Sequence, residues 1–458
     1  MNKKNQLDRR GFIKGVGVSA IATAAAAGTV SANALGQSTS RTSGKGYDFD
    51  EEFTRVNSRK WEGAYKTYGR DNIDVAMGTA DLDFKQLPAV VDALKDRAEY
   101  ENYGYESTPD SFYQSIIDWN KERYGQTVKK EWIKTSSALK PGMVSSMRGI
   151  NPHKGKVILL TPTYSGFRGA INKAGMRVEM SPMKRVNNRW TFDLDDLAER
   201  LDYETKCVVL CNPNNPSGEF WSAEEMMGLG DLCIERGVTV LSDEIHCDFP
   251  NKGAKFIPYA SLGEKYAETS ITYRSPSKTF GHACLRVAYF FTQNEDLMNA
   301  TMIGGGHEEG VNTFGVLAAE TAFREGAQWV DDVNEYLDAS HDYIVDYCNR
   351  PGAMPGVTYQ KSDGLYLAWF DCNGLKEKVA SPEQVRALHD KWRDEGNHRR
   401  VTPEMCMQEW IARNARIHIQ PGSSYGIGSE GFMRMNIGVP RALITKALDN
   451  WDAALKKL

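Results

Sequence analysis

Short apolar runs alternate with longer amphipathic stretches through the middle of the chain. The runs are rich in β-branched residues and occupy 157–160, 207–211, 238–241, 270–273 and 287–291. Strands that are apolar at successive positions suit a sheet covered on both faces, and such sheets are mostly parallel. The alternation therefore predicts an α/β fold with a mostly parallel sheet.

Helical patterns flank these runs on both sides. The stretches 87–100 and 108–124 each carry a proline near the first turn, a common way for a helix to begin. Beyond Phe323 we expect a long helix, and another that begins at Pro440. The apolar positions that define these two helices are Trp329, Val333 and Leu337, and Ile444, Leu448, Trp451 and Leu455.

The first 34 residues resemble a twin-arginine (Tat) export signal. Arg9 and Arg10 precede Gly-Phe-Ile-Lys, a weakly apolar stretch covers 15–30, and Ala32-Asn33-Ala34 is suited to cleavage. An unstructured tail or a membrane anchor is the alternative, but the apolar stretch is shorter than the roughly 18 residues of a span. We therefore expect a periplasmic protein without a membrane span.

The chain divides by pattern into five segments. We predict the Tat signal over 1–34, a linker over 35–46, and an N-terminal arm with a small-domain segment over 47–86. The large domain is expected over 87–325 and a smaller α+β domain over 326–458.

Composition narrows the classes of function. The 458 residues carry a formal net charge of -4, which offers no basic field for nucleic-acid phosphates, so no nucleic-acid partner is expected. The eight cysteines contain no CxxC pair, and we interpret them mainly as buried free thiols. A periplasmic disulfide stays open as an alternative. We expect no metal site.

Polar residues follow the predicted strands. Ligands of open α/β sheets bind outside the carboxyl ends of the strands, so these residues are the first candidates for a site. They are Thr161-Pro162-Thr163-Tyr164, the segment 211–218, Ser242-Asp243-Glu244-Ile245-His246, and Ser275-Pro276-Ser277-Lys278 with the nearby Arg286.

In this order, the motifs resemble fold-type I pyridoxal-phosphate (PLP) enzymes of the class I/II aminotransferase superfamily. Within it, the chain is most similar to the MalY/PatB-type cystathionine β-lyases. The residues that carry this resemblance are Ala80-Asp81-Leu82-Asp83-Phe84, Tyr103-Gly104-Tyr105, Asp243-Glu244-Ile245-His246, Ser275-Pro276-Ser277-Lys278-Thr279-Phe280 and Asn312-Thr313-Phe314-Gly315. The resemblance implies the PLP-dependent transferase (aspartate aminotransferase-like) fold and PLP as the cofactor.

The resemblance gives Lys278 and Asp243 the central roles. Lys278 would bind the cofactor covalently, because a lysine amine condenses with an aldehyde once burial and nearby cations keep part of it neutral. Asp243 would hold the proton on the pyridine nitrogen, which the cofactor needs to act as an electron sink. Taken alone, Asp243 could also be a helix N-cap.

Three further residues are implied to surround the cofactor ring. Asn215 and His246 would contact the phenolic oxygen, and Tyr164 would stack on the pyridine face. For His246 a structural role is an equal alternative, and for Tyr164 the alternative is a place in the core.

The cofactor phosphate needs hydroxyls, a cation and backbone amides. Ser275, Ser277 and Arg286 would supply the first two. The resemblance places the amides of Met143 and Val144 at the phosphate, as well as Tyr105 from a neighbouring subunit. The chain is therefore expected to form a homodimer with a shared active site.

Near the C-terminus, Gly431-Phe432-Met433-Arg434-Met435-Asn436 matches the segment whose arginine binds the substrate carboxylate in such enzymes. Arg434 is thus the expected anchor for a small amino-acid substrate, with a surface ion pair as the alternative.

Three functions follow from this site. The first is β-elimination from cystathionine or cysteine-conjugate-like amino acids, giving pyruvate, ammonia and a thiol. The second is an aminotransferase, because Arg286 is typical of that branch, and Asn214 and Gly78 depart from the β-lyase pattern. The third is a PLP-binding regulatory protein without turnover. The fold does not choose among them.

Overall fold

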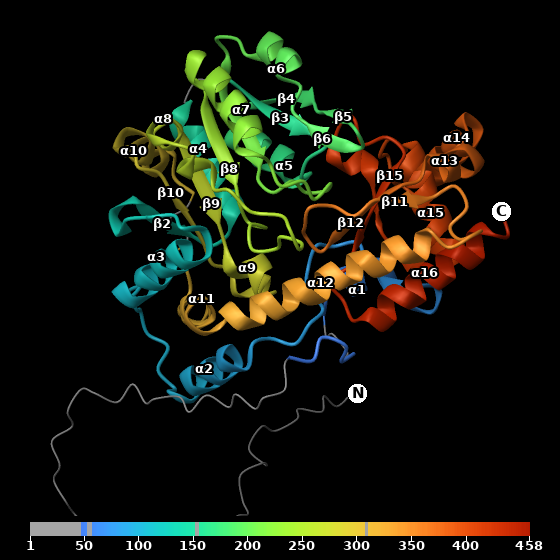
Figure 1. The fold of residues 1–458 in the computed structure, drawn as a ribbon, viewed down its shortest axis with the longest axis horizontal. Helices are drawn as coiled ribbons and strands as arrows, with labels where there is room; N and C mark the ends of the chain where they lie inside the picture. Colours follow the sequence, from blue (N-terminus) through green and yellow to red (C-terminus); the bar gives the residue numbers. More distant parts are fainter. Residues whose placement is uncertain (1–46, 53–56, 152–154, 307–309) are drawn as a thin grey trace, which may run out of the picture. The chain divides into compact units, whose positions relative to one another are not determined.

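The central sheet has seven strands within the described residues, in the order β2-β10-β9-β8-β7-β3-β4 (Figure 1). Its strands are β2 (Ile133–Ser136), β3 (Lys156–Thr161), β4 (Arg177–Pro182), β7 (Thr205–Cys211), β8 (Thr239–Asp243), β9 (Ser270–Arg274) and β10 (Ala288–Phe291). Neighbours pair in parallel from β4 to β9, and β10 is antiparallel to both β9 and β2. The predicted α/β fold and its five buried strands are confirmed.

The computed structural model describes residues 47–52, 57–151, 155–306 and 310–458. The predicted export signal over 1–34 and the linker over 35–46 lie outside the described residues. These described residues belong to one compact unit.

The two faces of the sheet carry separate cores. Val157 and Leu159 of β3 face one core, while Ile158 and Leu160 face the other, as the two-residue period of a strand requires. The first core includes residues of α4 (Leu139–Ile150), α5 (Gly166–Ala174) and α10 (Glu295–Gly304). The second includes residues of α6 (Leu194–Arg200), α7 (Ala223–Glu235) and α8 (Glu264–Ala267). Helices therefore cover both faces.

A second sheet, formed after α12 (Ala327–Cys348), has four antiparallel strands within the described residues, in the order β11-β12-β15-β14. They are β11 (Thr358–Tyr359), β12 (Leu367–Asp371), β14 (Gln420–Pro421) and β15 (Phe432–Asn436). Its helices are α13 (Asn373–Val379), α14 (Pro382–Asp394), α15 (Pro403–Ala415) and α16 (Arg441–Leu455). The apolar faces predicted for α12 and α16 are buried.

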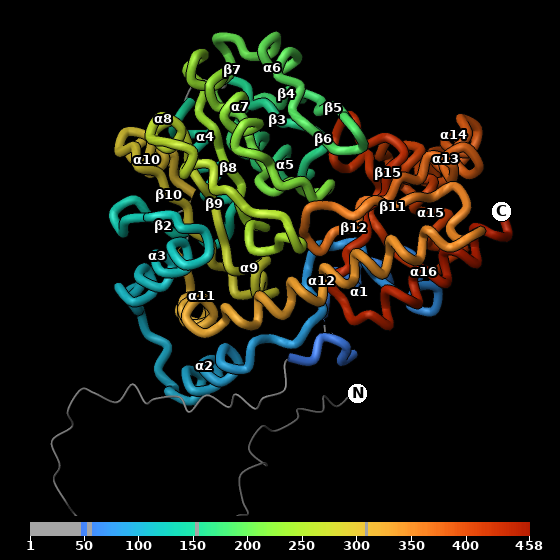
Figure 2. Tube along the Cα trace, viewed as in Figure 1, coloured from blue at the N-terminus to red at the C-terminus, as the bar shows by residue number. Residues whose placement is uncertain are grey.

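The N-terminal part of the described chain joins this second sheet region. β1 (Val75–Ala76) pairs in parallel with β13 (Ile417–His418), and the blue segment around α1 (Arg59–Tyr68) lies among red C-terminal segments (Figure 2). The helices α2 (Pro88–Glu99), α3 (Asp110–Tyr124) and α11 (Thr313–Glu325) pack on the large-domain side. Periodicity predicts α2 and α3 but not the short pair β1–β13.

Another element without a periodic signal is the hairpin of β5 (Lys184–Val186) and β6 (Arg189–Thr191), which is antiparallel and stands apart from both larger sheets. The short helix α9 (Pro276–Thr279) follows β9 directly.

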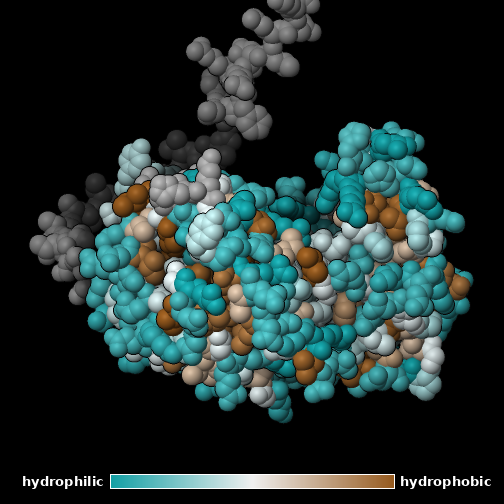
Figure 3. All heavy atoms as spheres, turned by 90° about the horizontal axis from the view of Figure 1, so that it is seen from above, coloured by the Kyte–Doolittle hydropathy of each residue, from teal (hydrophilic) through white to brown (hydrophobic). Residues whose placement is uncertain are grey.

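The surface is mainly polar, as expected when most large apolar side chains lie in internal cores. The face in Figure 3 is mostly hydrophilic, with hydrophobic residues scattered between polar ones. Within the described residues, no helix has the length and apolar character needed to cross a membrane. All eight cysteines are free and six of them are buried, as expected, while Cys348 is half-buried and Cys284 is exposed.

Candidate active site at the carboxyl ends of the central strands

Asp243 is the last residue of β8 and lies at the carboxyl end of the parallel sheet. Its backbone carbonyl accepts from the Asn212 amide (2.8 Å), and its carboxylate accepts from the Ile245 amide (3.1 Å). Burial, with the charge of Glu244 adding to it, raises the pKa of Asp243 to about 7. A buried carboxyl of this kind is suited to a cationic partner that restores its ionised form.

Lys278 lies in α9, directly beyond the end of β9. Its ammonium nitrogen donates to the Ala80 carbonyl. Burial lowers the pKa of Lys278, and the charges of Arg434 and Lys60 act in the same direction, while Asp81 and Asp243 oppose them. A larger share of neutral amine makes this lysine a better nucleophile and base.

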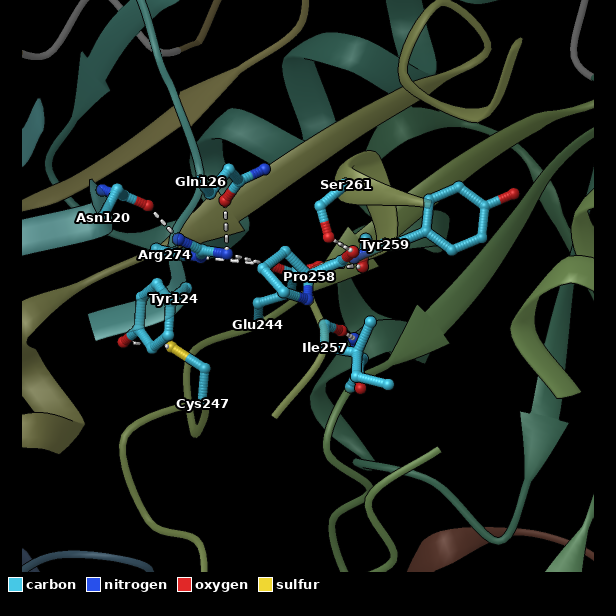
Figure 4. A network of polar contacts seen from close by, with 12 residues as sticks. Asn120, Tyr124, Gln126, Glu244, Cys247, Ile257, Pro258, Tyr259, Ser261 and Arg274 are labelled. Carbon is cyan, nitrogen blue, oxygen red and sulfur yellow. Dashed lines mark hydrogen bonds and ion pairs between the residues drawn. The ribbon is translucent and has the colours of Figure 1, made fainter. Parts of the chain in front are cut away.

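A buried ion pair joins the ends of β8 and β9, next to these two residues. Arg274, the last residue of β9, donates from Nε to Glu244 Oε2 at 3.0 Å. Figure 4 shows the guanidinium of Arg274 directed at Asn120, Gln126 and Glu244. Because Glu244 follows Asp243 and Arg274 precedes Ser275, the pair holds the ends of β8 and β9 in register.

Arg434 connects the second sheet to this site. It lies in β15, is 4% exposed, and donates from Nη1 to Asn215 Oδ1 (3.0 Å) and from Nη2 to the Gly78 carbonyl (2.6 Å). Its Nε has no hydrogen-bond partner in the described part of the chain. The arrangement brings together Arg434 and Asn215, both sequence candidates, and excludes the alternative of a surface ion pair.

His246 is buried beside the same residues. Burial holds the pKa of His246 well below its ordinary value, and the charges of Lys278 and Arg434 lower it further. Its Nδ1 has no hydrogen-bond partner among the described residues, and its ring lies 5.6 Å from that of Tyr366. A neutral imidazole with a free nitrogen is suited to a polar ligand atom.

Tyr164 lies just before α5, close enough to Asp243 and Arg434 for their charges to act on it. Burial raises the pKa of Tyr164, and the Asp243 charge raises it further. Gly166 leaves the room for this ring, because a Cβ at Gly166 would lie 2.3 Å from Tyr164 Cε1. The ring is therefore placed at the site by local sequence as well as by burial.

The serines predicted for the phosphate bond to each other. Ser275 caps α9, accepting from the Ser277 amide (3.1 Å), and its hydroxyl lies 2.6 Å from that of Ser277. Arg286 is exposed, has a left-handed backbone with φ of 53°, and makes no hydrogen bond that involves other described residues. It is thus available to a ligand anion.

Met143 and Val144 lie in the second turn of α4, and their side chains are buried in a core. Amides at these positions donate inside the helix, so the geometry does not present them to a phosphate. The amides at the helix start are those of Ala138, Leu139 and Lys140. The structure therefore does not support the predicted contact of the Met143 and Val144 amides with a phosphate, and the free amides lie about one turn earlier.

Tyr105 lies in the loop before α3 and is fully exposed. It does not approach Lys278 or Asp243 through any hydrogen bond or ring contact within the described chain. This position supports no role for Tyr105 at the site of its own chain.

Several residues at the site escape sequence reasoning. The Ala80 carbonyl meets Lys278, and Tyr425 lies under the Arg434 guanidinium at 5.2 Å. Tyr366 is fully buried, and its hydroxyl has no partner among described residues. Each depends on a contact between distant segments, so no local pattern identifies it.

Comparison with known proteins gives a consistent result. Residues 72–450 match the family described as Aminotransferase class I and II. The chain is 29% identical to cystathionine beta-lyase PatB of Bacillus subtilis over 413 residues, which cover 89% of this chain and 99% of that protein. The chain therefore belongs to the aminotransferase class I and II family, a family of enzymes.

Two solved structures agree in fold. A PLP-bound putative aminotransferase from Clostridium difficile has a TM-score of 0.79 and 29% identity, covering 89% of this chain and 100% of that chain. The PLP-bound C-S lyase from Staphylococcus hominis has a TM-score of 0.76 and 28% identity, covering 89% and 98%. The aspartate aminotransferase-like fold implied by the motifs is confirmed.

Proposed function

We propose that this protein is a PLP-dependent carbon–sulfur β-lyase that acts on cystathionine or cysteine-conjugate-like amino acids. The observation that carries the proposal is the placement of Asp243 at the end of β8 and of Lys278 just beyond the adjacent β9, close enough for the charges of Asp243 and Arg434 to act on Lys278. The relatives named for β-elimination cover nearly the whole chain. The products would be pyruvate, ammonia and a thiol.

The site fits PLP by the chemistry of its side chains. A buried carboxyl with a raised pKa suits a protonated pyridine nitrogen, and a lysine with a lowered pKa suits an aldehyde. The free Nδ1 of His246 and the amide of Asn215 suit the phenolic oxygen, and Tyr164 suits the ring face. PLP, when bound, withdraws electrons from the substrate Cα and makes its proton acidic.

The phosphate would be held by Ser275, Ser277 and Arg286 on one side. On the other side we propose the amides of Ala138 and Leu139 at the start of α4, where a helix terminus favours an anion.

The protein's own residues then divide the work. Arg434 binds the substrate carboxylate and orients Cα. The amine of Lys278, freed when the substrate amine takes its place on the cofactor, would take the Cα proton, helped by its lowered pKa. Asp243 would hold the proton on the pyridine nitrogen during the reaction. The thiolate leaves from Cβ with the electrons of the C–S bond. The aminoacrylate that remains becomes an imine, and water hydrolyses this imine to pyruvate and ammonia.

An aminotransferase is the second candidate, favoured by the exposed Arg286 and by relatives such as the Clostridium difficile protein. The deciding experiment gives the purified, PLP-loaded protein cystathionine and, separately, an amino donor with a 2-oxo acid. Pyruvate with thiol supports the lyase, and a new amino acid without thiol contradicts it. Neither product, with PLP still bound, would favour a regulatory PLP-binding protein.

We also propose a homodimer. Tyr103 and Tyr105 are exposed on the loop between α2 and α3, and the Tyr103 ring stacks on Phe314 at 6.1 Å. A second copy that covers this loop would place Tyr105 at the neighbouring phosphate. Light scattering of the purified protein is expected to give twice the chain mass, and Tyr105→Ala should weaken PLP binding if the subunits share their sites.

Periplasmic localisation rests on the Tat-like signal alone. Replacing Arg9 and Arg10 with lysine should retain the protein in the cytoplasm, as measured by cell fractionation. Export that persists in this variant, or in a strain without the Tat pathway, would contradict the proposal.

A further inference from the structure

Lys278 lies on a helix that is too short to be stable by itself. The helix α9 spans Pro276–Thr279, and isolated helices shorter than roughly 12 residues are marginal in water. Its orientation therefore depends on bonds to its surroundings. At its start, Ser275 accepts from the Ser277 amide at 3.1 Å and donates to the Val287 carbonyl at 2.6 Å. These contacts fix one end of the helix.

The other end of α9 is held by a buried carboxylate. Thr279, the residue after Lys278, is 2% exposed, and its hydroxyl donates to Asp248 Oδ2 at 2.6 Å. Gln86 adds a second contact, because its Nε2 donates to the Phe280 carbonyl at 2.6 Å. Of these two contacts, the bond of Thr279 is made by a side chain of the helix itself, one residue from Lys278.

Asp248 is itself fixed from two helices. It is buried and lies two residues beyond His246, in the turn that follows β8. Its Oδ1 accepts from the hydroxyl of Tyr124 at the end of α3. Its backbone carbonyl accepts from Asn334 Nδ2 of α12 at 2.7 Å. The carboxylate is therefore a preorganised acceptor for the hydroxyl of Thr279.

The two hydroxyls that meet Asp248 both keep their protons. Burial raises the pKa of Tyr124 well above its ordinary value, and the charge of Asp248 raises it further. Figure 4 shows Tyr124 directed at the turn after β8, where its hydroxyl lies 3.1 Å from Cys247 Sγ. A threonine hydroxyl is a donor at any working pH. Hydrogen bonds to an ionised acceptor are roughly twice as strong as those between neutral groups, so both bonds are suited to fixing a position.

The bond between Asp248 and Thr279 joins two segments of the strand-end site. Asp248 belongs to the turn that carries His246, and Thr279 belongs to the helix that carries Lys278. The strands β8 and β9, which precede these segments, pair in parallel within the sheet. The side-chain bond extends this connection beyond the sheet, to the residues that follow each strand. The position of Lys278 relative to His246 therefore depends on it.

We propose that Thr279 is a positioning residue for Lys278 and acts through its hydrogen bond to Asp248. The bond keeps the end of α9 from turning, so the amine of Lys278 stays at the Ala80 carbonyl, to which it donates. Loss of the bond should slow proton transfer at Cα more than it weakens substrate binding, because Arg434 lies on a different sheet. The assignment rests on the proposed role of Lys278 and not on the reaction that follows proton removal.

Exchange of the Cα proton of L-alanine in heavy water tests this role, because it needs only removal and return of that proton. In the PLP-loaded protein, Thr279→Val keeps the branched shape and removes the hydroxyl. The exchange rate at saturation should fall about tenfold, with little change in the concentration of L-alanine that gives half the rate. Thr279→Ser retains the hydroxyl and should recover most of the rate. A wild-type rate in Thr279→Val, or an equal loss in Thr279→Ser, would overturn the proposal.

Thr301→Val is the matched control. Thr301 is also buried, lies on α10, and its hydroxyl donates to Ser146 Oγ at 3.2 Å. Urea denaturation should show a loss of stability in this variant as in Thr279→Val, while the exchange rate stays at the wild-type value. Equal slowing in the two variants would mean that a general loss of stability explains the effect, and the positioning role would be refuted.

The rate of PLP capture gives a measurement without turnover. When the cofactor-free protein is mixed with PLP, the absorbance of the lysine-bound cofactor should appear about tenfold more slowly in Thr279→Val than in the wild type or Thr279→Ser. If L-alanine does not exchange in the wild type, this rate decides. Equal capture rates in the three proteins would then contradict the proposal.

A double-mutant cycle tests the bond itself in the cofactor-free protein. Thr279→Val and Asp248→Asn each remove part of the same contact, so their losses in urea denaturation should sum to more than the loss in the double variant. Strict additivity would refute the contact and the proposal with it. Should Asp248→Asn fail to fold, as judged by circular dichroism, the comparison of Thr279→Val with Thr279→Ser still decides.

These measurements also separate the positioning role from the proposed function. A wild-type protein that captures PLP and exchanges the Cα proton, but releases no pyruvate from cystathionine, contradicts the lyase and leaves the result for Thr279 unchanged. A wild-type protein that captures no PLP at Lys278 contradicts both.

Discussion

Arg274 and Arg286 lie near opposite ends of the segment that carries Lys278, yet their surroundings differ completely. Arg274 is 2% exposed and bonds to Glu244, Asn120 and Gln126. Arg286 is exposed and makes no hydrogen bond within the described chain. The first arginine completes the scaffold of the chain, while the second is available to a ligand. Removing each one should therefore damage a different property.

The largest effect is expected for Lys278→Ala. Without its amine the protein cannot bind PLP covalently or take the Cα proton, so the visible absorbance of the lysine-bound cofactor should vanish and turnover should fall at least about 10³-fold. Absorbance spectroscopy and a pyruvate assay measure both losses. The exposed Lys252→Ala is the control, and an unchanged spectrum in Lys278→Ala would disprove the assignment.

The second largest effect is expected when the buried ion pair between Arg274 and Glu244 is broken. Arg274→Met leaves the Glu244 carboxylate buried without its cation, which should lower the free energy of unfolding by about 3–5 kcal/mol. Urea denaturation measures the loss. The exposed pair of Arg70 and Glu62 offers a matched control, because Arg70→Ala should cost only about 0–1 kcal/mol. Equal losses in the two variants would remove the distinction between scaffold and surface.

Asp243 should make the stability of the protein depend on pH. In the cofactor-free protein its pKa rises from 3.8 to about 7, so between these values the folded state holds more protons than the unfolded state. The free energy of unfolding should then fall as pH rises, by at most about 1.4 kcal/mol per pH unit, and Asp243→Asn should flatten this slope.

Denaturation at several pH values between about 4 and about 7 tests the slope. The exposed Asp118→Asn serves as the control and should leave it unchanged. PLP should reduce it in the wild type, because a cationic pyridine nitrogen favours the ionised carboxylate. A slope that is the same with and without PLP would argue against contact between Asp243 and the cofactor.

The smallest effect is expected for Arg286→Ala. One charged hydrogen bond to a phosphate contributes about 1.5 kcal/mol, so PLP should bind roughly tenfold more weakly while stability stays the same. Equilibrium dialysis of PLP, with Arg236→Ala as an exposed control, measures the change. If Arg286→Ala unfolds more easily than the wild type, the arginine belongs to the scaffold after all.

Local patterns predicted much of the framework. Strands β3, β7, β8, β9 and β10 could be predicted from short apolar runs, because a strand buried on both faces has apolar residues at successive positions. The short pair β1–β13 and the β5–β6 hairpin could not be predicted in this way, because strands of two or three residues are too short to show a period that distinguishes them from loops. Candidates such as Asp243 and Lys278 likewise follow from their place after predicted strands, whereas their roles, and the candidates Arg434 and Tyr105, follow from the family resemblance.

The amino-acid sequence by itself determined the α/β fold and the candidates Lys278, Asp243 and Arg434. Only the tertiary structure decided what surrounds them. The contact of Arg434 with Asn215 joins segments far apart in the chain, and such a contact depends on packing between the second sheet and the large domain. Burial, which sets the pKa of Asp243 and Lys278, is likewise a property of the assembled fold, because no residue desolvates itself.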